Sequence, residues 1–333
     1  MTCDLVVIGA GAAGLAAARA ARSARRSVTL VDVARPGGDC THYGCVPSKT
    51  LLDVAHRVAG ARAAQQWGLP PVADVDFGKV MSHVRAVVAD VERDESAQQL
   101  AGEGIDLVRG WARFTGPHSV DVDGRRMEAS RFVLATGAHA AVPPVPGIGD
   151  VAYLTNRTLF ELVERPAHLL VLGGGAIGVE LAQAFAQLGS QVTLLEAAPR
   201  LLVKEEPEVS SIIAAVLERD GVEVRTGAAV EQVRPGPVLH VAGGGTVSGS
   251  HLLVAVGRSP ATAGMGLDRA GVVTGPGGEI VTDRHLRTSA RHIFAAGDCT
   301  SLLQFTHVAD EQGDWLPATR SPPDGRCPAC SVG

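Results

Sequence analysis

"DLVVIGAGAAGLAAARAARSARRSVTLVD", residues 4–32, is the stretch that decides the fold. A short run of valine, leucine and isoleucine opens it, which is typical of a strand buried in a parallel sheet. A G-x-G-x-x-G pattern and an alanine-rich helical segment follow, and a second apolar run ends at Asp32. This order of strand, glycine-rich turn, helix and acid-terminated strand is the βαβ unit that binds dinucleotides.

The same pattern occurs a second time. Residues 168–196 read "HLLVLGGGAIGVELAQAFAQLGSQVTLLE", and in both copies 18 positions separate the last glycine of the motif from the terminal acid. One glycine motif alone is weak evidence because glycine-rich turns are common, but two complete copies are hard to explain by chance. The sequence therefore predicts an α/β protein with two Rossmann-like, three-layer dinucleotide-binding domains.

Each motif residue has an expected role. The first glycine allows the tight turn, the second lets a pyrophosphate approach the backbone, and the third allows close helix–strand packing. The helix N-terminus attracts the phosphates, and the terminal acid accepts hydrogen bonds from the adenosine ribose. The expected contacts are Gly9, Gly11, Gly14 and Asp32 in the first copy, and Gly173, Gly175, Gly178 and Glu196 in the second.

A cysteine box follows the first copy. "GGDCTHYGCVPSK", residues 37–49, places Cys40 and Cys45 five positions apart. A structural disulfide is disfavoured in a chain of cytosolic type, and a zinc site needs more ligands than this pair and His42 supply. The favoured interpretation is a redox-active dithiol, which exchanges electrons with a flavin at short range. We therefore assign a flavin to the first unit and a nicotinamide to the second.

Composition limits the possible partners. Hydrophobic residues make up 46% of the 333 residues and charged residues 20%, which is typical of a globular chain. The net charge of −5 and the lack of a basic block argue against nucleic acid or a membrane surface as a partner. Glycines interrupt the apolar N-terminal segment, and no basic residues precede it as they would in a signal peptide. No apolar run is long enough to span a membrane. We expect a cytoplasmic protein.

The second unit is expected to take NAD(H) rather than NADP(H). Glu196 would repel the additional phosphate of NADP(H). Arg200 lies close enough in the sequence to keep NADP(H) open as the less favoured alternative.

Taken together, these segments resemble the flavin-dependent pyridine nucleotide–disulfide oxidoreductases, the group of dihydrolipoamide dehydrogenase, glutathione reductase and mercuric reductase. The resemblance rests on the cysteine box, the two glycine motifs, "ATG" at 135–137, "VGRSP" at 256–260 and "AAGDC" at 295–299, in the order of that family. It covers about residues 4–312.

The resemblance implies an oxidoreductase of EC 1.8.1 type, similar to dihydrolipoamide dehydrogenase. Electrons would pass from NAD(P)H through FAD to a Cys40–Cys45 disulfide, or in reverse, with a small-molecule disulfide or dithiol as substrate. The NAD domain, residues 150–265, would be inserted into an FAD domain formed by residues 1–149 and 266–312.

The resemblance also implies roles for single residues. Cys45 would lie against the flavin, and Cys40 would exchange with the substrate. Lys49 and Glu180 would form a pair at the reactive end of the flavin. The further FAD contacts implied are Gly38, Lys49, Ala112, Thr136, Gly137 and Asp298, and the further NAD contact is Gly257.

The cysteine box has its own local expectations. We expect a turn through the box and a helix that begins at 46–47, because proline is favoured at a first helical position. That N-terminus would lower the pKa of Cys45 and hold it as a thiolate. The box departs from the family at Asp39, where threonine is usual, and at His42 and Tyr43, where small residues are usual.

The C-terminal segment differs most from the family. The family continues past "FTHVADEQG", residues 305–313, into an interface domain that builds the homodimer and supplies an acid–base histidine. Residues 313–333 are rich in proline and glycine and are expected to be disordered. We therefore expect that the homodimer of the family does not form and that turnover is impaired.

Other interpretations stay open for this segment and for the whole chain. Cys327 and Cys330 form an unassigned C-x-x-C, and no metal site is predicted. A metal reductase like mercuric reductase and a flavin-binding remnant without catalysis are the alternative functions.

Overall fold

The computed structural model describes residues 2–300, 302–316 and 319. The described chain divides into two compact units. Unit 1 comprises residues up to His42, Ala89–His139 and the described residues from Ser259 onward, and unit 2 comprises Tyr43–Val88 and Ala140–Arg258. These contact-based limits place Tyr43–Val88 with the second unit, whereas the sequence boundaries placed that segment in the FAD domain.

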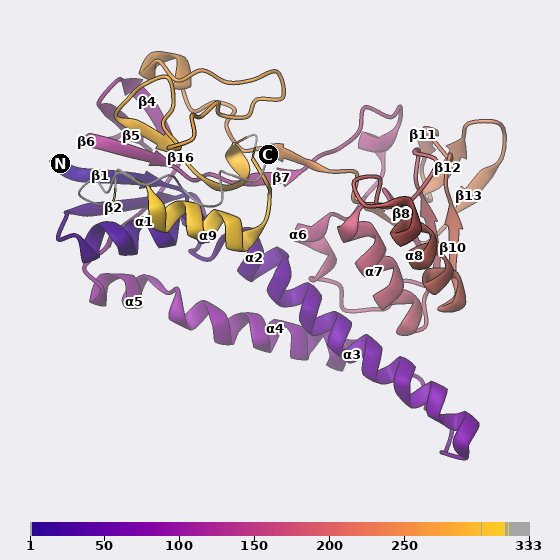
Figure 1. The fold of residues 1–333 in the computed structure, drawn as a ribbon. Coiled ribbons are helices and arrows are strands. Elements are labelled where there is room, and N and C mark those ends of the chain that lie inside the picture. Colours follow the sequence, from indigo (N-terminus) through magenta and orange to yellow (C-terminus); the bar gives the residue numbers. More distant parts are fainter. Residues whose placement is uncertain (1, 301, 317–318, 320–333) are drawn as a thin grey trace. The chain divides into compact units, whose positions relative to one another are not determined.

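Unit 1 is built on a seven-stranded sheet of order β3-β2-β1-β6-β5-β4, with β16 also paired to β6 (Figure 1). The pairs among β1, β2, β3, β6 and β16 are parallel, and β4 and β5 add an antiparallel edge. The strands are β1 (Thr2–Ile8), β2 (Val28–Asp32), β3 (Asp106–Arg109), β4 (Ala112–Gly116), β5 (Ser119–Val122), β6 (Arg125–Leu134) and β16 (Ile293–Ala295).

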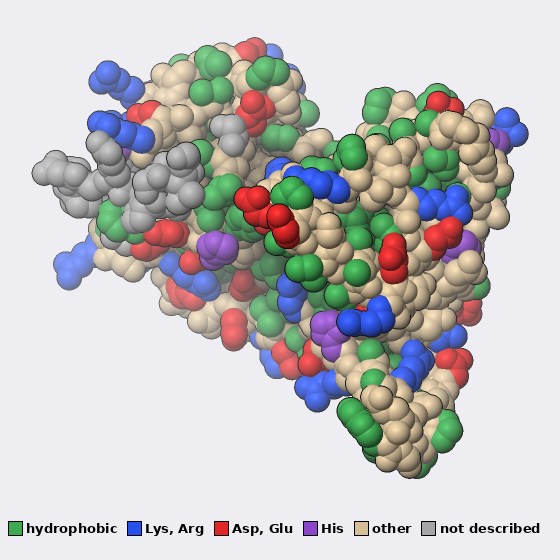
Figure 2. All heavy atoms as spheres, turned by 45° about the vertical axis from the view of Figure 1, so that its right-hand side comes forward, with side chains coloured by type: hydrophobic (Ala, Val, Ile, Leu, Met, Phe, Trp, Pro, Cys, Tyr) green, Lys and Arg blue, Asp and Glu red, His purple; other side chains and the backbone are tan. Residues whose placement is uncertain are grey.

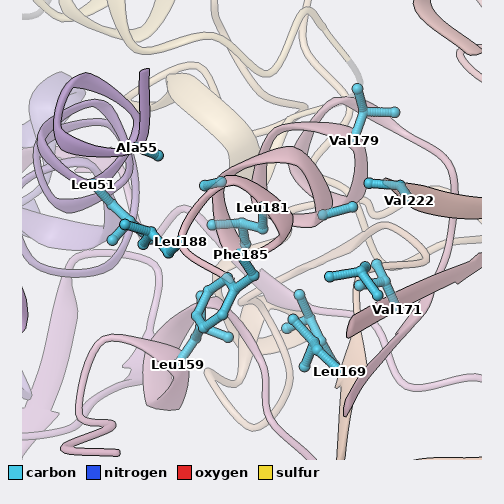
Figure 3. Packing of buried hydrophobic residues seen from close by; sticks show 14 of the residues in the cluster. Leu51, Ala55, Leu159, Leu169, Val171, Val179, Leu181, Phe185, Leu188 and Val222 are labelled. Carbon is cyan, nitrogen blue, oxygen red and sulfur yellow. The ribbon is translucent and has the colours of Figure 1, made fainter. Parts of the chain in front are cut away.

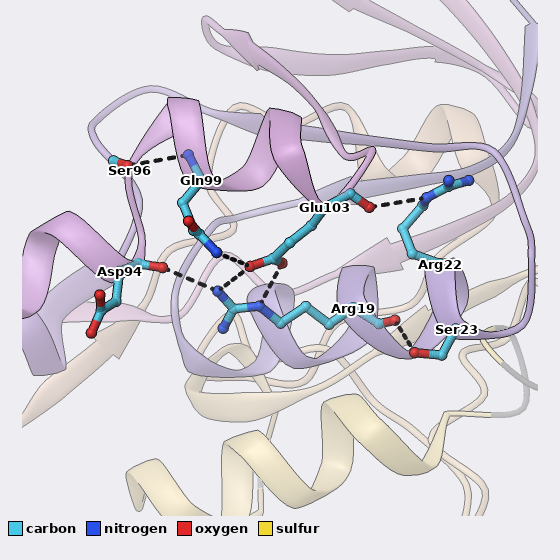
Figure 4. A network of polar contacts seen from close by, with 7 residues as sticks. All are labelled: Arg19, Arg22, Ser23, Asp94, Ser96, Gln99 and Glu103. Carbon is cyan, nitrogen blue, oxygen red and sulfur yellow. Dashed lines mark hydrogen bonds and ion pairs between the residues drawn. The ribbon is translucent and has the colours of Figure 1, made fainter.

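Helices α1 (Ala12–Ser23) and α9 (Thr306–Trp315) pack side by side in unit 1 (Figure 1). Alanines on the buried face of α1 allow this close approach, and a Cβ at Gly313 of α9 would overlap the backbone oxygen of Ala13. An ion pair between Arg19 and Glu103, with nitrogen and oxygen 2.9 Å apart, ties α1 to the residue that follows α5 (Ala97–Gly102), as Figure 4 shows. Unit 1 also contains the short helices η3 (Leu267–Ala270) and η4 (Gly297–Cys299).

Unit 2 contains the second copy of the repeat on a four-stranded parallel sheet of order β10-β9-β8-β14. A separate antiparallel sheet joins β11, β12 and β13. The elements are η1 (Ala64–Trp67), η2 (Ile148–Asp150), α6 (Asn156–Leu159), β8 (His168–Leu172), α7 (Ala176–Gln187), β9 (Gln191–Leu195), α8 (Pro207–Arg219), β10 (Val222–Arg225), β11 (Val230–Arg234), β12 (Val238–Val241), β13 (Thr246–Ser248) and β14 (His251–Val254).

The core of unit 2 gathers apolar side chains from several helices and the sheet, and Figure 3 shows part of it. Phe185 and Leu181 of α7 lie against this core together with Leu51 of helix α3 (Cys45–Ala63) and Leu159 of α6. Leu51, Leu159 and Phe185 are completely buried. Because α3 and α6 share one core, their positions relative to each other are fixed by packing.

Helices α2 (Gly38–Tyr43) and α4 (Phe77–Asp94) each continue across a limit between the units, and the short strands β7 (Ala138–Ala140) and β15 (Arg258–Pro260) pair where the chain crosses again. The predicted turn through the cysteine box is wrong, because α2 is a helix. The predicted helix start at 46–47 is also wrong, because α3 begins at Cys45. Pro47 is tolerated there, since the first helical N–H groups have no partner within the helix.

The predicted α/β class with a parallel sheet in each unit is confirmed. Helix α9 runs to Trp315, three residues into the segment that was expected to be disordered, and Cys327 and Cys330 lie outside the described residues. Within the part of the chain that the structure describes, no helix is both long enough and apolar enough to cross a bilayer. On the face drawn in Figure 2, acidic and basic side chains are interspersed rather than separated by sign.

Candidate functional site

The first glycine-rich turn leaves room at its second glycine. Gly9 has φ +107°, and a Cβ there would overlap the backbone oxygen of Ala135. A Cβ at Gly14 would overlap the backbone oxygen of Gly9. At Gly11, the N-cap of α1, a Cβ would come no closer than 3.8 Å to a neighbouring backbone atom. The fold itself therefore requires glycine at the first and third positions, whereas the second position leaves space at an uncapped helix N-terminus.

The second turn repeats this geometry in unit 2. Gly173 has φ +114°, and a Cβ at Gly178 would overlap the Gly173 oxygen. Gly175 is the N-cap of α7 with no side-chain cap, and nothing lies within 4 Å of its hypothetical Cβ. Each turn is thus a cradle in which helix N–H groups face an open space, and this geometry fits a pyrophosphate.

The acids that end the second strands have a role that the sequence did not predict. Asp32 accepts a hydrogen bond of 2.6 Å from the amide of Ala10, between the first two glycines, and Glu196 accepts an equivalent bond of 2.6 Å from Gly174. The other oxygen of each carboxylate accepts a bond from the amide two residues further on, at 2.8 and 2.7 Å. Each acid therefore holds its glycine-rich turn in shape.

The strand register brings three further expected FAD contacts, Thr136, Gly137 and Asp298, to the same edge of unit 1 as Gly9. Leu134 of β6 lies between Ile8 of β1 and Ala295 of β16 in parallel register. The segments after these three strands carry Gly9, Thr136 with Gly137, and Asp298, so they emerge at the same carboxyl edge, where parallel sheets bind ligands. A Cβ at Gly38, whose φ is +65°, would lie 2.7 Å from the Cα of Gly11. Ala112 begins β4 and is buried.

Unit 2 has an equivalent edge. Leu172 of β8 pairs in parallel register with Leu195 of β9 and Val254 of β14. Gly173 and Gly257 follow β8 and β14 at this edge, and Gly257 has φ +143° with open space around its hypothetical Cβ.

Arg200 forms hydrogen bonds within the loop that follows β9. Its guanidinium donates to the backbone oxygens of Glu205 at 2.7 Å and Val203 at 2.8 Å, and to Ser210 Oγ at 2.7 Å. Ser210 is buried, so this cluster shapes the loop from inside.

The cysteines of the box lie on successive helices. Cys40 is half-buried on α2 and is placed with unit 1, whereas Cys45 is exposed at the first position of the 19-residue helix α3 and is placed with unit 2. His42 between them is buried, and its Nε2 lies 2.6 Å from the Pro36 oxygen.

Lys49 and Glu180, which the family resemblance pairs, form an ion pair. Lys49 Nζ lies 2.8 and 2.7 Å from the two carboxylate oxygens of Glu180, joining α3 to α7. The two side chains are 59% and 36% exposed, so the pair contributes little to stability. Its consequence is positional, because it holds a lysine one turn after Cys45.

The other described cysteines are poor candidates for chemistry. Cys299 is completely buried, and burial raises the pKa of its thiol to about 11. Burial also raises the pKa of Cys3 at the start of β1. Among residues 2–300, 302–316 and 319, no group of three or more metal-ligating side chains comes together.

Two contacts to the box were not predictable from the sequence. Asn156 Nδ2 donates to the Tyr43 oxygen at 3.2 Å, and the Arg157 guanidinium carbon lies 5.4 Å from the centroid of the Tyr43 ring. The only signal was the T-x-x-T pattern of Thr155 and Thr158, which forms a capping box at the start of α6.

Comparisons with known proteins agree on one group. The sequence model of the family described as "Pyridine nucleotide-disulphide oxidoreductase" matches residues 3–313. A mercuric reductase of Streptomyces lividans is 40% identical over 93% of this chain and 68% of its own length, and a mercuric reductase of Bacillus cereus is 36% identical over 93% and 50%. A dihydrolipoyl dehydrogenase of Thermus scotoductus is 36% identical over 94% and 69%.

The solved structures point the same way. The HOCl-induced flavoprotein disulfide reductase RclA from Escherichia coli superposes with a TM-score of 0.83 at 34% identity, covering 93% of this chain and 69% of RclA. A Cu(II) complex of RclA gives a TM-score of 0.84 at 33% identity. The chain spans from half to about two thirds of the length of these relatives.

Proposed function

The chain belongs to the pyridine nucleotide-disulphide oxidoreductase family, and from this membership we propose that it is an FAD-dependent oxidoreductase that passes electrons between NAD(H) and a Cys40–Cys45 disulfide. The observation that carries the proposal is the position of Cys45. It is exposed at the first residue of α3, with Lys49 one turn later and held by Glu180. A helix N-terminus and a nearby ammonium are what a reactive thiolate needs.

FAD and a pyridine nucleotide are the cofactors of this family, and each of the two units has a cradle for a dinucleotide. In unit 1, the amides after Gly11 would receive the FAD pyrophosphate, and Asp32 would receive the adenosine ribose. Asp298, at the same sheet edge, would bind the ribityl chain. Bound FAD supplies a ring that accepts hydride from a nicotinamide and yields two electrons to a disulfide.

The protein residues then carry out the exchange with substrate. Cys40, as thiolate, attacks one sulfur of the substrate disulfide and releases the other sulfur as a thiolate. Cys45 attacks the Cys40 sulfur, which restores the protein disulfide and releases the second substrate thiolate. The two substrate sulfurs gain two electrons and take up two protons. Lys49 would stabilise negative charge beside Cys45, and Glu180 orients that ammonium through two hydrogen bonds.

The geometry of unit 2 supports NAD(H) rather than NADP(H). Glu196 places a carboxylate at the end of β9, where the additional phosphate of NADP(H) would be repelled. Arg200, the nearby cation that could have offset this repulsion, uses its guanidinium to hold the loop of Val203 and Glu205.

The proposal is tested by anaerobic titration of the FAD-loaded protein with NADH. We expect a long-wavelength band from a thiolate against the oxidised ring once two electrons have entered the protein, and bleaching of the flavin absorbance as further electrons are added. In Cys45→Ser the band disappears while FAD binding remains. Cys3→Ser is the matched control and should behave as wild type, because Cys3 is at the opposite end of β1 from the glycine-rich turn. Bleaching without the band in the wild type would contradict the role of the cysteine pair.

A second candidate, reduction of a soft metal ion, is favoured by the names of the relatives. The relatives from Streptomyces lividans and Bacillus cereus are mercuric reductases, and RclA was solved as a Cu(II) complex. A reduced dithiol binds such ions through its thiolates. The same titration distinguishes the two candidates when the reduced protein is mixed with lipoamide in one arm and Hg(II) chloride in the other.

A further inference from the structure

The segment between Cys40 and Cys45 is contacted by residues that lie outside α2 and α3. Tyr43 is the last residue of α2, Gly44 follows, and Cys45 is the first residue of α3. Gly44 is the N-cap of α3 and makes no side-chain hydrogen bond to it. The first turn of α3 therefore has no side-chain cap, and contacts to Tyr43, the residue before Gly44, add to what fixes the start of this helix.

Two residues of α6, Asn156 and Arg157, contact Tyr43. Asn156 is only 6% exposed, and its side-chain amide donates to the Tyr43 backbone oxygen at 3.2 Å. A buried amide needs such a partner. The guanidinium of Arg157 lies over the Tyr43 ring, 5.4 Å from its centroid, within the range of a cation–π contact. Asn156 thus fixes the backbone of Tyr43, and Arg157 fixes its ring.

The helix that supplies these contacts is itself anchored. Thr155 and Thr158 form a reciprocal capping box that closes the single turn of α6. Leu159, completely buried, belongs to the same hydrophobic core as Leu51 and Ala55 of α3, as Figure 3 shows. The contacts to Tyr43 and the helix that begins with Cys45 therefore rest on one packed core.

We propose that Asn156 and Arg157 are positioning residues for the redox pair. By holding Tyr43, they restrict the positions that the start of α3, and with it Cys45, can take. The proposal rests on the function proposed above, because it requires these two cysteines to be redox-active.

The measurable reaction is exchange with glutathione. Glutathione disulfide gains two electrons and two protons and becomes two thiols, while the Cys40 and Cys45 thiols lose two electrons and two protons and form one S–S bond. Without the contacts to Tyr43, Cys45 samples more positions, and the effective concentration of one thiol at the other falls. The equilibrium constant for forming the protein disulfide must then fall as well.

The experiment equilibrates the full chain in glutathione buffers and follows the peptides that carry Cys40 and Cys45 by mass spectrometry after alkylation. Arg157→Ala and Tyr43→Leu should each lower the equilibrium constant roughly two- to five-fold. The double variant should lower it no further, because both substitutions remove the same contact. Asn156→Ala removes the bond to the backbone and should lower the constant roughly two- to ten-fold.

Two further variants serve as controls. Arg157→Lys keeps the charge and should restore part of the loss. Glu161→Ala changes an exposed residue just after α6 and should leave the constant unchanged. An unchanged constant in Arg157→Ala, or additive effects in the double variant, would overturn the positioning role. Failure of the underlying function would look different, because wild-type Cys40 and Cys45 would then form no bond at any glutathione ratio.

Discussion

The glycines of the second glycine-rich turn differ in whether the fold or a bound ligand requires them. A Cβ at Gly178 would overlap the Gly173 oxygen, whereas a Cβ at Gly175 would enter open space at the start of α7. Gly178→Ala should therefore lower the free energy of unfolding by about 1–3 kcal/mol, because the overlap forces the backbone to shift. Gly175→Ala should leave that free energy within error and weaken NADH binding at least about ten-fold, because the methyl occupies the phosphate space.

Urea unfolding and calorimetric titration with NADH check the two variants. If Gly175→Ala destabilised the protein as much as Gly178→Ala, its glycine would be a requirement of folding rather than of the ligand. The sequence predicted these separate roles from spacing alone. The second role of the acids was not predictable, because the bond from Glu196 to Gly174 depends on how the turn folds back on the strand end.

At the scale of helices and strands, apolar runs and glycine punctuation predicted the two βαβ units well, because each buried parallel strand is a continuous apolar run. The cysteine box was predicted less well. Its polar and glycine residues carry no helical periodicity, and α2 was missed for that reason. The contacts of α6 could not be predicted, because the one-turn helix gains its place from tertiary packing with α3 rather than from propensity.

Three side chains on adjacent parallel strands of unit 2 are linked by hydrogen bonds, and they predict that the stability of the protein depends on pH. Thr193, completely buried on β9, donates to Glu223 of β10 at 2.8 Å and accepts from His168 of β8 at 2.9 Å. Burial lowers the pKa of His168, partly offset by Glu223. Burial acts to raise the pKa of Glu223, but bonds from Arg225 and Thr193 bring it below its usual value.

Both shifts have the same consequence. A histidine whose folded pKa lies below its unfolded value of about 6.5 stabilises the protein above that pH, and the stability is lost as the pH falls further. Glu223 adds a further loss at lower pH. The thermal midpoint should therefore fall between pH 7 and pH 5, and it should fall less steeply in His168→Gln. His56→Gln, which alters an exposed residue of α3, is the control, and equal slopes in all three proteins would refute the role of His168.

At the scale of the whole molecule, each compact unit is assembled from separate segments of the chain. The cysteine box crosses the limit between the units, with Cys40 on one side and Cys45 on the other. Local sequence patterns cannot reveal such a limit, because it depends on contacts between residues far apart in the chain. The repeat does predict that each unit carries its own dinucleotide cradle, and hydrogen exchange can test which cradle takes which cofactor.

Ligands stabilise the part of a protein that they bind, by about 2.7 kcal/mol at a hundred times Kd, so amides there exchange more slowly. NADH should protect peptides from residues 168–196 and 251–258, and FAD should protect peptides from residues 4–32. NADPH should protect less than NADH at equal concentration, because Glu196 repels its additional phosphate. Gly175→Ala should lose the NADH effect and keep the FAD effect. Protection of residues 4–32 by NADH alone would reverse the assignment, because a nicotinamide dinucleotide would then occupy the cradle that precedes the cysteine box.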